Sequence, residues 1–99
     1  MSGLGEAIAA DARLIILREL AQQVDGRLSE LLLRRVLDDY GIRRDRDWVA
    51  TQLRKLDQLG AIELTPMGTT LIARIARPGR DHIDERATIE GVTRPTDFG

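Results

Sequence analysis

The side chains best suited to bind a ligand gather between residues 43 and 55. Arginine can donate two hydrogen bonds to guanine, glutamine can exchange two with adenine, and basic side chains hold phosphates. These residues open a predicted helix and line its polar side, a placement that suits entry into the major groove of DNA. The expected base contacts come from Thr51, Gln52, Arg54 and Lys55, and the expected backbone contacts from Arg43, Arg44 and Arg46.

Charge alone does not select DNA as the partner. The net charge is −1, whereas DNA-binding domains usually carry a basic excess. Residues 1–30 hold 3 basic and 5 acidic side chains, residues 31–60 hold 7 and 5, and residues 61–99 hold 5 and 6. The basic excess therefore lies in the middle third. Asp45, Asp47 and Asp57 are interleaved with it, so an ordinary solvated helix face is a second interpretation.

Catalysis has little support in the residue types. There is no cysteine, which excludes disulfides, zinc–thiolate sites and a cysteine nucleophile. The one histidine lies in an acidic stretch, residues 81–85, where His82 and Glu85 have the three-residue spacing that places an imidazole and a carboxylate on one helix face. Such a stretch is more often a solvated helix. We expect no enzymatic activity, no metal site and no cofactor.

Three segments have helical periodicity. Their predicted bounds are residue 4 or 11 to 24, residues 30–40 and residues 46–59. Ser29 and Asp45 are typical N-caps, and Gly41 and Gly60 fit the left-handed position after a helix end. The predicted buried faces consist of Leu14, Leu17, Ala21 and Val24 in the first helix, Leu32, Leu33, Val36, Leu37 and Tyr40 in the second, and Val49, Leu53, Leu56 and Leu59 in the third.

The first predicted helix carries a second apolar stripe beside the first one. This stripe contains Ile8, Ala12 and Ile15, so more than half of the helix circumference is apolar. It can be buried between helices of the same chain, or it can pack on a second copy of the chain. A homodimer interface at Ile8, Ala12 and Ile15 is one hypothesis, and burial under residues that follow Arg80 is the other.

Beyond residue 61 the apolar pattern changes from helical to alternating. Residues 62–65 and 71–75 alternate, and Pro66, Met67 and Gly68 favour a turn between them, so we predict a β-hairpin. The stretch from Thr65 to Thr70 has neither lysine nor arginine, so it offers phosphates only hydroxyl and amide groups. A short strand is predicted at residues 27–28.

The C-terminal part gives weaker signals. Residues 80–87 are predicted to form two helical turns packed through Ile83 and Ala87. Residues 88–99 have no periodicity and are expected to form an extended or disordered tail. The predicted domain thus spans residues 1–87. No apolar run reaches the ~18 residues of a membrane span and no signal peptide is evident, so we expect a cytoplasmic protein that does not enter a membrane.

The order of these elements predicts an α+β, mainly α fold, a winged helix-turn-helix. Its parts are a three-helix core, a β-hairpin wing, a short C-terminal helix and an extended tail. The most specific signal is the run from Leu53 to Leu64, in which two leucines bury the helix end, Gly60 ends it, and a β-branched residue opens the strand.

Over nearly its whole length the chain resembles small winged-helix proteins of Mu-like prophages, which are grouped loosely with regulators of the ArsR type. The resemblance rests on the arginine and aspartate that open the third helix, on the Leu53, Leu56 and Gly60 spacing, and on residues 91–95. It implies a phage-encoded, DNA-associated protein, either a transcriptional regulator that binds double-stranded DNA or a component near DNA packaging. The metal ligands of ArsR sensors have no counterpart here.

Two classes of function remain open from the sequence. The first is a regulator that reads DNA with its third helix. The second is a protein-interaction or assembly module, for example in phage DNA packaging, without direct DNA binding. The near-zero net charge and the uncharged hairpin loop favour the second class, and the fold favours the first by analogy.

Overall fold

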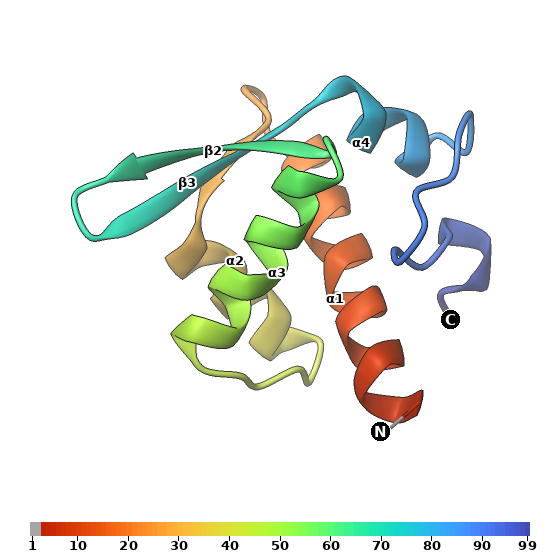
Figure 1. Ribbon diagram of the computed structural model, residues 1–99, viewed down its shortest axis with the longest axis horizontal. Coiled ribbons are helices and arrows are strands. Elements are labelled where there is room, and N and C mark those ends of the chain that lie inside the picture. The colour runs from red at the N-terminus through yellow and green to blue at the C-terminus, as the bar shows by residue number, and fades with distance from the viewer. Residues whose placement is uncertain (1–2) are drawn as a thin grey trace.

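The computed structural model describes residues 3–99, which form four α-helices, one three-stranded antiparallel sheet and one 3₁₀ turn (Figure 1). Residues 1 and 2 of the predicted domain lie outside the described part. In chain order the elements are α1 (Gly3–Gln22), β1 (Arg27–Ser29), α2 (Glu30–Asp39), α3 (Arg46–Gln58), β2 (Ile62–Met67), β3 (Thr70–Ile75), α4 (Arg77–Ile83) and η1 (Pro95–Asp97). The α+β class and the order of helices and strands agree with the prediction.

The predicted N-caps of α2 and α3 are confirmed. The Ser29 hydroxyl accepts a hydrogen bond from the Leu32 amide at 3.2 Å, and the Asp45 carboxylate accepts one from the Trp48 amide at 2.9 Å. Each cap satisfies an N–H group that has no partner inside its helix. The start of α3, and with it the position of its basic side chains, is therefore fixed by Asp45.

The sheet has the strand order β1-β3-β2, with every pair antiparallel. The hairpin turns at Gly68 and Thr69, because Met67 still pairs with Thr70. The prediction placed the turn at residues 66–68, so it included Gly68 but began two residues too early. Proline is tolerated there because β2 is an edge strand, and the Leu71 amide opposite Pro66 points away from β2 toward the Glu30 carboxylate.

The core lies between the helices and the inner face of the sheet. It is built from aliphatic side chains of α1, α2 and α3 together with Ile62, Ala73 and Ile75. Three residues assigned to buried faces are exposed instead: Val24 (108%), Leu32 (43%) and Tyr40 (51%). Val24 falls beyond the end of α1, in the turn before β1, and Tyr40 falls beyond the end of α2, as its C-cap. Leu32 lies at the margin of the α2 stripe.

The C-terminal part differs most from the prediction. Helix α4 begins at Arg77 rather than at residue 80, since Pro78 fits the first turn of a helix and Gly79 is buried against the sheet. The C-terminal segment (residues 88–99) is not a free tail. It lies along α1 (Figure 1), where the Thr93 amide donates to the Ala10 carbonyl at 3.3 Å and Val92 is buried.

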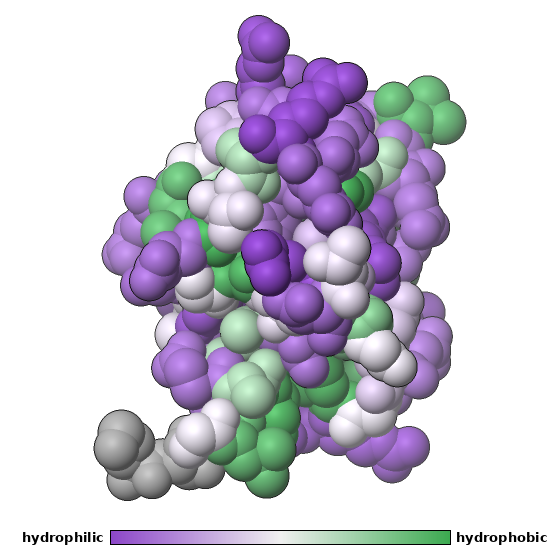
Figure 2. Space-filling view, turned by 90° about the vertical axis from the view of Figure 1, so that its right-hand side faces the viewer, coloured by the Kyte–Doolittle hydropathy of each residue, from purple (hydrophilic) through white to green (hydrophobic). Residues whose placement is uncertain are grey.

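The second apolar stripe of α1 is covered within the chain. Ala12 and Ile15 are fully buried and Ile8 is half-buried. A dimer interface at Ala12 and Ile15 is therefore contradicted, because neither side chain reaches the surface of this fold. Figure 2 shows the face on which the C-terminal segment lies, and its apolar residues are scattered among hydrophilic ones. No helix within residues 3–99 is both long and apolar enough to span a membrane.

Substitution of Gly79 tests how tightly α4 is packed. A Cβ atom there would overlap the Ala61 carbonyl oxygen and lie 3.1 Å from Ile75 Cγ1 and 3.2 Å from Leu17 Cδ2. We expect Gly79→Ala to lower the free energy of unfolding by about 1–3 kcal/mol, as overpacking does, measured by urea denaturation. Gly3→Ala is the matched control, since nothing lies within 4 Å of the added methyl group. Equal denaturation midpoints for the two variants would contradict the packing.

Candidate nucleic-acid interface

Helix α3 presents one polar face to solvent. Val49, Leu53 and Leu56 are buried, which turns Thr51, Arg54 and Lys55 outward. Their side chains are exposed, and neither Arg54 nor Lys55 forms an ion pair among the described residues. The two cations are therefore available to an anionic partner, as the sequence predicted for them.

Gln52 does not belong to that face. It is 4% exposed, and its Oε1 accepts a hydrogen bond from Arg13 Nε at 2.9 Å. Arg13 is itself buried, and its Nη1 donates to the Gly91 carbonyl at 2.8 Å. The predicted base contact of Gln52 is therefore wrong: its side-chain carbonyl accepts a hydrogen bond from a buried guanidinium instead. Helical periodicity alone had placed it at the edge of the polar face.

The three arginines before and at the start of α3 have different surroundings. Arg43 is exposed. Arg44 is half-buried, with its guanidinium stacked over the Trp48 ring at 5.4 Å from the centroid. Arg46 is 54% exposed and pairs with Glu30, Nη2 to Oε1, at 3.4 Å. Of these three guanidinium groups, only that of Arg43 has no partner within residues 3–99, and Arg46 is partly exposed although it is paired with Glu30.

A groove separates the start of α3 from the β2–β3 hairpin. It comprises two adjoining hollows, of about 190 and 260 Å³. Arg46 and Arg54 line it on the α3 side, and Thr69 and Thr70 line it on the hairpin side. The hairpin loop supplies no cation, in keeping with the sequence, so the positive charge of the groove comes from the helices.

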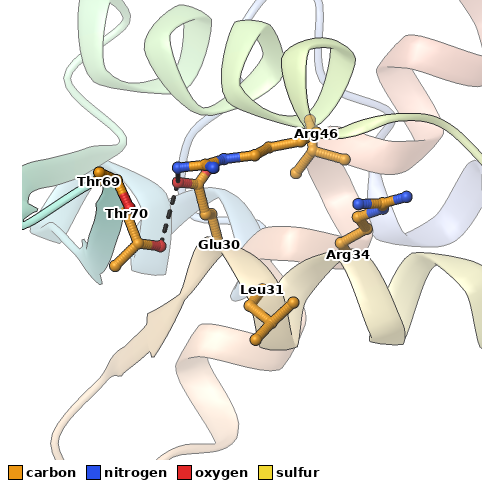
Figure 3. Close-up of a pocket in the computed structure, with 7 residues that line it drawn as sticks. Glu30, Leu31, Arg34, Arg46, Thr69 and Thr70 are labelled. Atoms are coloured by element: carbon orange, nitrogen blue, oxygen red, sulfur yellow. Dashed lines mark hydrogen bonds and ion pairs between the residues drawn. The ribbon is translucent and has the colours of Figure 1, made fainter.

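Glu30 lies in the same groove and was not predicted as a site residue. Its side chain is 6% exposed, and its Oε1 accepts from the Leu71 amide at 2.9 Å and the Thr70 hydroxyl at 3.1 Å. Figure 3 shows Arg46 reaching across from α3 to this carboxylate, with Thr70 on the hairpin side. Its position directly after the N-cap of α2 gave no signal of these contacts, which join residues about forty apart in the chain.

The histidine is buried, not solvated as expected. His82 is 1% exposed; its Nδ1 accepts from the Ile89 amide at 3.0 Å, so the ring proton lies on Nε2, which is 2.9 Å from the Thr93 carbonyl. Both ring nitrogens thus hold the C-terminal segment against α4. Within residues 3–99 no group of three His, Cys, Asp or Glu side chains is placed to hold a metal ion.

Comparison with known proteins shows that the chain is similar in sequence to a phage protein. It is 28% identical to the uncharacterized protein gp26 of Escherichia phage Mu over 92 residues, which cover 93% of this chain and 95% of gp26. No protein-family model matches the chain. No solved structure is significantly similar to it. The similarity to gp26 supports an origin in a Mu-like phage.

Substitutions of Gln52 and Gln58, both on α3, test whether Gln52 has a structural role. Gln52→Ala leaves a donor of the buried Arg13 without its partner, so we expect a loss of about 1–3 kcal/mol in the free energy of unfolding. Gln58→Ala removes an exposed side chain and should change it by less than about 0.5 kcal/mol. Chemical denaturation of both variants makes the comparison. A neutral Gln52→Ala would contradict the structural role of the hydrogen bond between Arg13 and Gln52.

Proposed function

We propose that the chain is a winged helix-turn-helix protein that binds double-stranded DNA, with α3 as the recognition helix and the β2–β3 hairpin as the wing. The element order supports this assignment: α1, β1, α2, α3 and a hairpin whose returning strand pairs with β1. In such folds the exposed face of the second helix of the motif enters the major groove.

The observation that carries the proposal is the outward face of α3. Arg54 and Lys55 are exposed and free of ion pairs within the described chain, and Thr51 lies one turn before them. Between residues 43 and 57 there are five basic side chains and three acidic ones, a local excess of two positive charges on an otherwise acidic protein. This excess lies along the groove, where phosphates would meet Arg54, whereas Arg46 is paired with Glu30.

The wing is expected to contribute little electrostatic attraction. Thr69 and Thr70 offer hydroxyls, and Gly68 and Thr69 offer turn amides, but no cation lies in the loop. Binding therefore rests on a few phosphate contacts from α3 and from the residues before it. We infer modest affinity for arbitrary DNA, as is suitable for a transcriptional regulator whose selectivity comes from base contacts of Thr51, Arg54 and Lys55.

A second candidate function is assembly with another phage protein without DNA binding. Two exposed apolar side chains favour it, Met67 at the tip of the hairpin and Leu31 at the start of α2, each 61% exposed. An apolar interface would be nearly indifferent to salt, whereas phosphate contacts would not. We propose no catalytic role for either candidate.

Fluorescence anisotropy with a labelled generic duplex tests the proposal. If two phosphates are contacted, affinity should fall about tenfold between 50 and 200 mM salt, because each contact releases a condensed counterion. Arg54→Ala combined with Lys55→Ala should remove most of the binding and flatten this salt dependence. The matched control, Arg77→Ala with Arg80→Ala, deletes two exposed arginines of α4 away from the groove and should bind as wild type does. Flat anisotropy from folded wild-type protein at both salt concentrations would contradict DNA binding.

A further inference from the structure

The groove between α3 and the hairpin contains a negative charge where an anion-binding groove would not be expected to have one. Glu30 is buried at its floor and lines both hollows. A buried carboxylate is costly unless donors surround it. Here the Leu71 amide, the Thr70 hydroxyl and Arg46 all point at the same oxygen, Oε1.

These contacts occupy Arg46, which faces both hollows of the groove. Its Nη2 lies 3.4 Å from Glu30 Oε1, although its side chain is 54% exposed and within reach of a ligand. Arg54, on the same helix, has no such partner within residues 3–99. A phosphate in the groove would have to draw Arg46 away from the carboxylate and would also meet its negative charge.

We propose that Glu30 is a specificity-determining residue of this interface, because its buried carboxylate withholds Arg46 from DNA phosphates. The inference rests on the proposed DNA-binding function. It follows that Arg46 adds no affinity for DNA that lacks favourable base contacts. Binding then depends on the residues that contact bases. The carboxylate also holds the hairpin through Thr70 and Leu71, so release of Arg46 is coupled to the position of the wing.

The same contacts would also be present if Glu30 had only a structural role. If Glu30 served only to fix the hairpin, any acceptor of the same shape would suffice, and its charge would not matter for DNA. Glu30→Gln separates the two roles. The glutamine carbonyl can still accept from the Leu71 amide and the Thr70 hydroxyl, but the negative charge and the ion pair with Arg46 are lost.

The experiment measures affinity for a generic duplex at several salt concentrations. Glu30→Gln should bind more tightly than wild type, and the ratio of its affinities at 50 and 200 mM salt should exceed the wild-type ratio about 3.5-fold, as one added phosphate contact requires. The gain should vanish in the Arg46→Ala background. Glu63→Gln is the control, because Glu63 is an exposed carboxylate 3.8 Å from Arg74 on the outer face of the sheet; it should leave both quantities unchanged.

The outcomes separate this inference from the proposed function. Unchanged or weaker binding by Glu30→Gln, with wild type still binding, would overturn the role of Glu30 alone. A gain that persists without Arg46 would do so as well. Wild type that does not bind duplex at 50 mM salt would overturn DNA binding itself, and with it the inference.

A measurement on the wild-type protein covers the case in which Glu30→Gln does not fold. The side-chain Nε–Hε signal of Arg46 and the Leu71 amide signal, followed by NMR as generic duplex is added, should stay in place while α3 amides shift. A large shift of both signals would overturn the proposal, because Arg46 would then leave Glu30 in the wild-type complex.

Discussion

The hydrogen bonds of the Arg13 guanidinium are the interactions on which the arrangement of this protein depends. The guanidinium is buried on α1, and it donates from Nε to Gln52 on α3 and from Nη1 to the Gly91 carbonyl of the C-terminal segment. A buried cation needs such acceptors, and Nη1 also lies 3.6 Å from the carboxylate of Glu6. One side chain thus fixes both the helix that presents the basic face and the segment that covers α1.

Glu30 has the corresponding role on the other side of α3. Arg13 holds the helix from behind through Gln52, while Glu30 joins the start of the helix, through Arg46, to the hairpin. Between these two buried charges, α3 is left with Thr51, Arg54 and Lys55 directed at solvent. The buried charges therefore set the direction in which the free ones point, and the groove beside the hairpin follows from the same contacts.

Local signals in the sequence were sufficient for most of the fold. The caps Ser29 and Asp45, the alternation on both hairpin strands and the outward position of Arg54 were all predicted, because each depends on neighbours within one or two turns or on a simple period. Gln52, His82 and Glu30 were misassigned or missed. Their partners lie 39, 11 and 41 residues away, and periodicity does not tell which polar residue is paired inside the protein. The sequence left open whether the second stripe of α1 packs on another copy or under residues that follow Arg80, because the segment that covers it has no pattern of its own.

The central claim is that duplex DNA meets α3 and the groove beside it. An amide-shift map of ¹⁵N-labelled protein, recorded with and without a generic duplex at low salt, tests this most directly. The account predicts shifts confined to α3, the residues before it and the hairpin loop, with α4 and the C-terminal segment unchanged. An unchanged spectrum, or shifts centred on α4 or the C-terminal segment, would contradict it.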